Sequence, residues 1–136
     1  MVSVPSGPKA SRIILAAALL FLNGCADNLI GPDNQLEVAN QTDTFEWQVT
    51  ALDDVTQTLT YAWAMTGTVA NVNQSSGPAG GSATLRILDV AGAEVYARSL
   101  AENGTFQTST GAAGNWTIVV TLSGVSGAVN FRVEKP

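Results

Sequence analysis

Two hydrophobic patterns divide the chain. Residues 13–22 form an unbroken apolar run, IILAAALLFL, which is apolar on every side of a helix and shorter than the roughly 20 residues that a membrane-spanning helix needs. From Gln35 onward, hydrophobic and polar residues alternate with a period of two, and Gly, Asn and Asp interrupt the alternation. This second pattern is typical of short β-strands joined by turns, so we predict an all-β body.

The clearest alternation lies near the C-terminus. NWTIVVTLSG places four hydrophobic side chains on one face of a strand, namely Trp116, Ile118, Val120 and Leu122. AVNFRVEK repeats the pattern with Val129, Phe131 and Val133. The segment GVSG, which begins and ends with glycine, separates the two, so we predict a C-terminal hairpin.

Other segments show the same alternation. Strands are predicted in TFEWQVTAL, TLTYAWAM, QLEVAN, TVANVN and GTFQTST, and a second hairpin is predicted in SATLRILDVAGAEVYARSL, with its turn around Ala91 and Gly92. We therefore expect one domain of about eight or nine short strands, arranged as a β-sandwich or jelly roll. Residues 72–83, VNQSSGPAGGSA, are so rich in Gly and Ser that we predict the longest loop there.

The segment before the alternating body has the features of a secretory signal. Residues 1–12 contain Lys9, Arg12 and no acid, and the apolar run follows directly. The run ends in LNGC, residues 22–25, which contains the chain's single cysteine. LNGC resembles the lipobox of bacterial lipoproteins, although Asn23 stands where Ala, Ser or Thr is usual. The resemblance implies cleavage between Gly24 and Cys25 and a diacylglyceryl lipid on the Cys25 sulfur.

This resemblance predicts the organisation and location of the chain. It gives a signal-peptide helix at residues 1–24, a lipidated cysteine and tether at residues 25–34, and the β-domain at residues 35–136. Several acyl chains on one residue anchor a protein stably, whereas a single chain binds a membrane only marginally. We therefore expect a protein of the bacterial cell envelope that is attached to a membrane through its lipid, and Ala26 after the cysteine implies the outer membrane.

Composition and charge exclude several classes of function. The 6 Lys and Arg residues are outnumbered by 11 Asp and Glu residues, and a net negative charge opposes the phosphate backbone, so we expect no nucleic-acid partner. The chain contains no histidine, which excludes the Ser-His-Asp and Cys-His nucleophile systems. We expect a protein that is not an enzyme and that carries no cofactor besides the lipid.

The order of motifs in the body also resembles the bacterial pre-peptidase C-terminal domain. An Asp stands before an aromatic strand, a strand ends in Asp and Gly before an aromatic residue, and a late Gly-x-Trp strand precedes a glycine turn. The matching residues are Asp43, Phe45, Asp89, Gly92, Tyr96, Gly114, Trp116 and Ile118. The resemblance implies a small jelly roll that acts as a non-catalytic accessory module. Some members bind calcium through paired acids, but Thr44 replaces one of them here.

Four aspartates are candidate calcium ligands. Asp53 and Asp54 lie in a predicted turn, and Asp43 and Asp89 stand at predicted strand ends. Carboxylate oxygens are the ligands that calcium prefers. The alternative is that these residues are solvated acids in turns, because the spacing of a known calcium loop is missing. No other metal site is predicted.

Aromatic residues suggest a second kind of site. Trp47, Tyr61, Trp63 and Trp116 could form a platform that stacks on sugar rings, but each lies on the apolar face of its strand, which favours the core. Trp63 is the candidate for sugar stacking, since Thr and Ala occupy the other face of its strand and leave the inward face least certain. We expect a protein-interaction or structural module that binds an envelope protein. The alternative is an accessory module that binds a polysaccharide or calcium.

Overall fold

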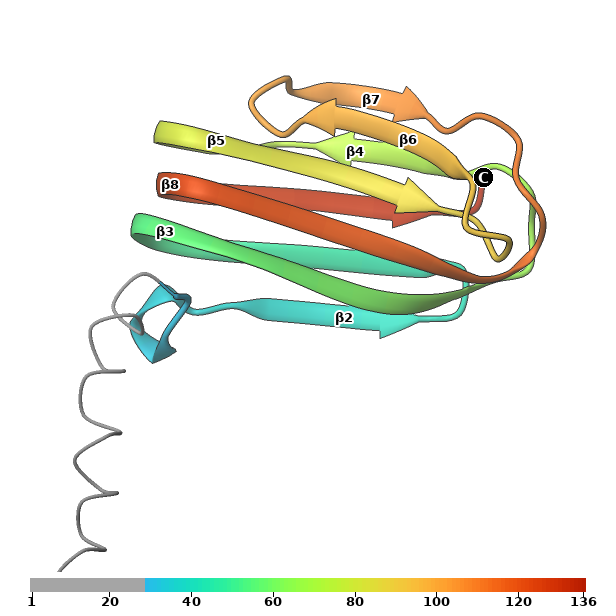
Figure 1. Ribbon diagram of the computed structural model, residues 1–136, viewed down its shortest axis with the longest axis horizontal. Coiled ribbons are helices and arrows are strands. Elements are labelled where there is room, and N and C mark those ends of the chain that lie inside the picture. Colours follow the sequence, from blue (N-terminus) through green and yellow to red (C-terminus); the bar gives the residue numbers. More distant parts are fainter. Residues whose placement is uncertain (1–28) are drawn as a thin grey trace, which may run out of the picture.

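The computed structural model describes residues 29–136, and these contain seven antiparallel strands (Figure 1). A short 3-10 helix, η1 (Pro32–Asn34), precedes them. The strands are β2 (Glu37–Gln41), β3 (Thr44–Met65), β4 (Asn71–Gln74), β5 (Gly77–Leu88), β6 (Glu94–Ser99), β7 (Gly104–Gln107) and β8 (Gly114–Glu134). The prediction of an all-β fold is confirmed. No helix within residues 29–136 is long and apolar enough to span a membrane.

The strands form one sheet that folds over into two layers. The first layer contains β2, residues 44–49 of β3, residues 129–134 of β8, β4 and β7. The second layer contains residues 57–65 of β3, residues 114–122 of β8, residues 82–88 of β5, and β6. Because β3 and β8 belong to both layers, they hold the sandwich together covalently as well as by packing.

The three longest strands bend at a common edge, which we call the fold edge. It comprises residues 51–54 of β3, 80–81 of β5 and 124–127 of β8, and lies at the left of Figure 1. The strand register shifts there, as it does at β-bulges. Positive φ angles occur at Ala51, Asp54, Gly81, Gly124 and Gly127. A Cβ atom on Gly81 would collide with the carbonyl group of Gly124, so glycine permits this close crossing.

The fold edge corrects three predictions. GVSG does not close a hairpin, because it lies inside the continuous strand β8. Residues 72–83 are not a loop, since β4 and most of β5 lie there. Asp53 and Asp54 lie within β3 and not in a turn between two strands. Two pairs of predicted strands are therefore single long strands, and the domain has seven strands in place of eight or nine.

The β5–β6 hairpin is confirmed. Ala83, Leu85 and Ile87 of β5 are buried, and Val95 is buried on the returning strand. The turn between the strands contains Gly92 at φ 86°, a conformation that glycine adopts without steric cost. Alternation therefore predicted both the strands and their inward faces here.

Aromatic side chains fill the space between the layers. Trp47, Trp63 and Trp116 are each 0% exposed. The Trp47 indole N–H donates to the Tyr61 hydroxyl across the layers at 2.8 Å. The Trp63 indole N–H donates to the carbonyl oxygen of Gln41 at 2.9 Å. Each buried indole thus satisfies its only polar group, as does Trp116 through Ala112. The prediction that the three Trp side chains form the core is confirmed, and Tyr61 is half-buried against it.

Candidate functional site

The structure gives Asp43 a structural task. Its carboxylate accepts hydrogen bonds from the backbone N–H and the hydroxyl of Thr66, both at 2.7 Å, and lies 3.4 Å from Nζ of Lys135. The N–H of Asp43 donates to Ala64 at 2.9 Å. Asp43 therefore holds the β2–β3 turn against the end of β3 and the C-terminal segment.

The Asp89 carboxylate likewise binds backbone N–H groups, at the β5–β6 turn. One carboxylate oxygen accepts from the N–H groups of Ala91 at 2.9 Å and Ala93 at 3.0 Å. The other oxygen accepts from the N–H of Ala112 at 2.9 Å. Asp89 is only 7% exposed, so these three donors replace the water that a free carboxylate would bind. The turn and the segment that precedes β8 are joined through this side chain.

These hydrogen bonds favour the ionised form of both carboxyl groups, so the stability of the fold depends on pH. The N–H of Thr66 is the main cause of the lowered pKa of Asp43, and the N–H of Ala112 is the main cause of the lowered pKa of Asp89. A carboxyl whose pKa is lower in the folded state stabilises the fold above its unfolded-state pKa. We therefore expect this stabilisation to be complete at neutral pH and to be lost as the pH falls below about 4.

The four candidate calcium ligands do not converge. Asp53 and Asp54 lie on the fold edge, whereas Asp43 and Asp89 each bind backbone N–H groups at other places in the domain. Within residues 29–136, no three Asp, Glu, Cys or His side chains are grouped so that they could hold a metal ion. The calcium hypothesis thus loses the cluster on which it depended.

The remaining predicted site residues have different outcomes. Trp63 is fully buried against Trp116, with ring centroids 6.0 Å apart, so the prediction that Trp63 stacks on sugars from solvent is wrong. Its inward face was uncertain from sequence because Thr and Ala alternate with it. Gly24 and Cys25 lie outside the described residues, and the predicted lipidation and cleavage stay predictions.

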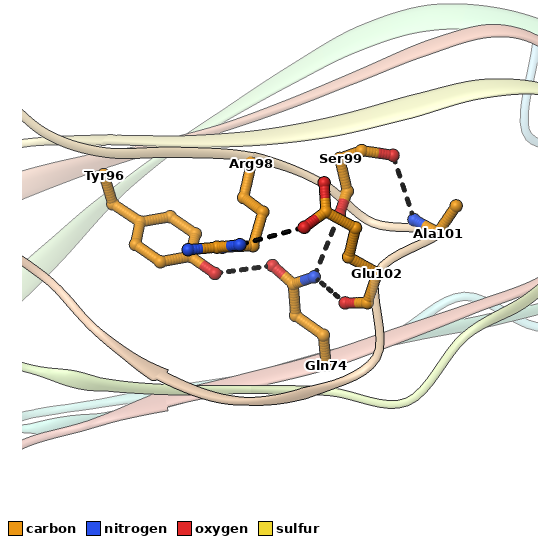
Figure 2. Close-up of polar contacts among 6 residues, drawn as sticks. All are labelled: Gln74, Tyr96, Arg98, Ser99, Ala101 and Glu102. Carbon is orange, nitrogen blue, oxygen red and sulfur yellow. Dashed lines mark hydrogen bonds and ion pairs between the residues drawn. The ribbon is translucent and has the colours of Figure 1, made fainter.

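A buried polar cluster joins the layers where β6 faces β4 and β7 (Figure 2). The Tyr96 hydroxyl donates to the side-chain oxygen of Gln74 at 2.7 Å, and the Gln74 amide donates to the carbonyl oxygens of Ser99 and Glu102. Burial is the main cause of the raised pKa of Tyr96. Gln74 is only 2% exposed, and its side-chain oxygen and nitrogen both have partners, so this cluster closes the core between the layers.

Arg98 covers that cluster from the solvent side. Its guanidinium lies 3.8 Å from the ring centroid of Phe106 on β7 and 2.9 Å from the Glu102 carboxylate. A cation over an aromatic ring closes an edge of the sandwich while its charge stays paired. Sequence reasoning missed Gln74 and Arg98. The role of a polar residue at an inward strand position can be recognised only when its hydrogen-bond partner on the other layer is known.

The outer surfaces of the two layers differ. In the first layer, all but one of the outward side chains are polar, and carboxamides are the commonest group; we call this surface the amide face. Its members are Glu37, Ala39, Gln41, Thr44, Glu46, Gln48, Asn71, Asn73, Thr105, Gln107, Asn130, Arg132 and Glu134. In the second layer, the outward residues of β3 and the first half of β8 are mostly small, namely Thr58, Thr60, Ala62, Ala64, Thr117, Val119 and Thr121.

Rows of paired side chains cross the amide face. One row runs from Ala39 through Glu46, Arg132 and Asn73 to Thr105. Within this row, Arg132 lies 3.2 Å from the Glu46 carboxylate, and the Thr105 hydroxyl donates to Asn73 at 2.9 Å. The row therefore has hydrogen-bonding groups along its length, except at Ala39.

A hollow of about 270 Å³ opens over Ala39. Its walls include the side chains of Glu37, Gln48, Asn130 and Arg132. Within residues 29–136, no hydrogen bond or ion pair involves the side chains of Glu37, Gln48 and Asn130. These groups offer both donors and acceptors, so the hollow can take a polar or positively charged group but has no exposed aromatic ring for stacking.

Comparisons with known proteins identify no family. No protein-family model matches the chain, and no curated protein matches it in sequence. The resemblances to bacterial lipoproteins and to the pre-peptidase C-terminal domain stay predictions.

Proposed function

We propose that this protein is a lipid-anchored module of the bacterial cell envelope that binds a protein partner without catalysis. The observation that carries the proposal is the amide face, a five-strand surface whose hollow is lined by unpaired carboxylate and carboxamide groups. Carboxamides bind by hydrogen bonds and do not act as acid or base, and a carboxylate needs a buried, tuned environment to do so. The three side chains that line the hollow without a partner are exposed or half-exposed.

The path of the chain before β2 supports an upright orientation on a membrane. The Ile30 N–H donates to the side chain of Gln57 at 3.0 Å, and the Asn34 side chain donates to Ala51 at 2.8 Å. The predicted tether is therefore docked on β3, at and beside the fold edge, from Ile30 onward. Four residue steps separate Cys25 from Leu29, a reach of about 13 Å. A lipid on Cys25 would keep the fold edge near the membrane and leave the amide face open at the side.

The alternative functions have less support. A polysaccharide would have to bind the amide face through hydrogen bonds alone, because the three Trp side chains are buried. Calcium would need acids other than the four predicted ones, since these lie apart. A partner protein can use the strand backbone as well as the polar side chains, so a protein is the partner that we propose.

Metabolic labelling tests the anchor. Cells that express the full chain are fed an alkyne fatty acid, and the protein is followed in membrane and soluble fractions. We expect Cys25→Ser to lose the label and to leave the membrane fraction. Asn23→Ala is the matched control, because it keeps the cysteine and brings the motif closer to the usual lipobox; it should stay labelled. A Cys25→Ser variant that still fractionates with membranes would refute the lipid anchor.

A further inference from the structure

The free edge of β2 lacks most of the features that usually prevent strand addition, and its one charged residue is Glu37. β2 pairs with β3 on one side and with nothing else within residues 29–136. All five of its residues are exposed. It contains no Lys, Pro or Gly, and its register with β3 has no bulge. Natural edge strands generally carry at least one of these features, because an unprotected edge can accept another strand.

The other strand edges are protected. β7 has only four residues and begins with Gly104 at φ 145°. The register of β6 with β5 shifts next to Leu88, and its Arg98 is stacked on Phe106. The second half of β3 is capped where the Asn40 side chain donates to Ala62 at 2.9 Å. Within the described part of the chain, β2 therefore has the most accessible edge.

The β2–β3 turn determines which backbone groups face this edge. Gln41 pairs with Thr44 across a two-residue loop, and residues that close such a loop exchange backbone hydrogen bonds. Because bonded and free positions alternate, Gln41 bonds toward β3, while Val38 and Asn40 direct their N–H and C=O groups away from it. Within residues 29–136, the backbone hydrogen bonds outside the ladders include none from Val38 or Asn40.

The hollow adjoins the same edge. Ala39 lies between Val38 and Asn40, and its small side chain leaves open the space beside Glu37 and Glu46. Both of these residues are acids. Glu46 is paired with Arg132, which also lines the hollow, whereas Glu37 forms no ion pair within the described residues. A strand added to β2 would place one side chain directly opposite Ala39. A long cationic side chain at that position can enter the hollow.

We propose that an extended segment of a partner protein adds to β2 as an antiparallel strand and inserts a Lys or Arg side chain into the hollow over Ala39. This inference rests on the proposed binding function but does not depend on the lipid. Backbone bonds to Val38 and Asn40 supply the register, and Glu37 with Glu46 selects the cation. A second copy of the chain is a poorer occupant. Antiparallel pairing of two β2 strands would place Ala39 opposite Ala39, so no cationic side chain would enter the hollow, and the two fold edges would point in opposite directions.

Peptide binding to the full chain in detergent micelles tests the proposal. The probe is the labelled peptide Thr-Thr-Val-Lys-Val-Thr-Thr, which places Lys outward and Val inward, and the comparison peptide has Glu in place of Lys. Binding is measured by fluorescence anisotropy, and amide NMR shifts locate it on the chain. We expect the Lys peptide to shift the Val38 and Asn40 amides. We expect the Glu peptide to bind at least tenfold more weakly, since it meets two carboxylates.

Two matched pairs of variants separate the edge from the hollow. Val38→Pro removes an outward N–H and should abolish binding, whereas Val38→Thr keeps the N–H and should bind normally. Ala39→Leu fills the hollow and should weaken binding at least tenfold, while Thr121→Leu, on the outer surface of the second layer, should have no effect. If Val38→Pro does not fold, the Ala39→Leu variant and the Glu peptide still decide the question.

Three outcomes would overturn the proposal: equal binding of the two peptides, unchanged binding by Ala39→Leu, or no binding up to about 1 mM peptide. A dimer that forms without peptide and is lost in Val38→Pro would identify a second copy as the occupant. None of these results depends on lipidation. If the peptide does not bind but Cys25→Ser leaves the membrane fraction, only the partner-strand proposal is rejected. If the peptide binds but Cys25→Ser stays in the membrane fraction, only the lipid anchor is rejected.

Discussion

The two outer surfaces of this sandwich share two strands, β3 and β8, but have different chemistry. β3 contributes Glu46 and Gln48 to the amide face, yet beyond the fold edge it contributes Thr60 and Ala62 to the other surface. β8 changes in the same way, from Thr117 and Val119 to Asn130 and Arg132. The inward positions of both halves stay hydrophobic, except at Gln57 and at the fold edge.

This difference separates the requirements of folding from those of binding. Both halves satisfy the same inward pattern, so packing does not explain why one outer surface is rich in carboxamides and charge. Threonine and valine are ordinary residues for an exposed sheet surface because they favour extended backbone. Asn, Gln and Glu are less favourable there, and the binding role that we propose for the amide face would account for this difference.

The largest expected effect is on the shared core. Trp116→Ala should lower the free energy of unfolding by about 3 to 5 kcal/mol, because it empties a fully buried site. The ring packs edge-on against Trp63 at 82°, and its N–H donates to Ala112 at 2.7 Å. Urea denaturation measures the change. Val119→Ala on the outer surface is the control and should cost less than about 1 kcal/mol. Equal effects of the two substitutions would contradict the assignment of inward and outward positions.

The fold edge should show the next largest effect. Gly81→Ala should destabilise the protein by about 2 to 4 kcal/mol, since it adds a side chain at φ 73° and forces Cβ against the Gly124 carbonyl group. Gly80→Ala is a neighbouring control, because nothing lies within 4 Å of its added Cβ. Thermal denaturation of both variants gives the comparison. If the Gly81 variant is as stable as the Gly80 variant, the strands do not cross closely there.

The smallest stability effects should come from the outer surfaces. Arg132 on the amide face and Arg86 on the other surface are 48% and 45% exposed and each pairs with a glutamate. Arg132→Gln and Arg86→Gln should each change the unfolding free energy by less than about 1 kcal/mol. Only Arg132→Gln should strengthen binding of the Lys peptide, by a few-fold, because it frees Glu46. Equal effects of the two variants on peptide binding would contradict a site on the amide face.

Alternation predicted the strands well but predicted their ends poorly. Trp116, Ile118 and Val120 are buried as expected, and so are Phe45 and Trp47. The errors lie at the fold edge, where the sequence pattern predicts turns or loops at GVSG, at the Gly-rich start of β5 and at Asp53–Asp54. A bulge and a hairpin both favour glycine at positive φ. Glycine at these positions therefore does not distinguish a strand that bends and continues from two strands joined by a hairpin turn.

The candidate site was predictable only in part. Asp43 and Asp89 were recognised as special positions, but their spacing could not reveal that their partners are the backbone N–H groups of Thr66 and Ala112. The amide face could not be predicted, because its rows combine residues from five strands, most of which are distant in sequence. No pattern in the residues next to Ala39 marks it as special, because the hollow forms only where larger side chains from neighbouring strands surround it.

The sequence by itself determined an all-β domain, the inward face of most strands, and an acidic chain without histidine. These properties follow from local alternation and composition, which need no knowledge of the pairing of strands. The tertiary structure alone decided that β3 and β8 continue through the fold edge, that Gln74 meets Tyr96 inside the core, and that a hollow adjoins the free edge of β2. Each of these depends on contacts between residues far apart in sequence, and cross-strand register, which sets those contacts, is a property of the assembled sheet.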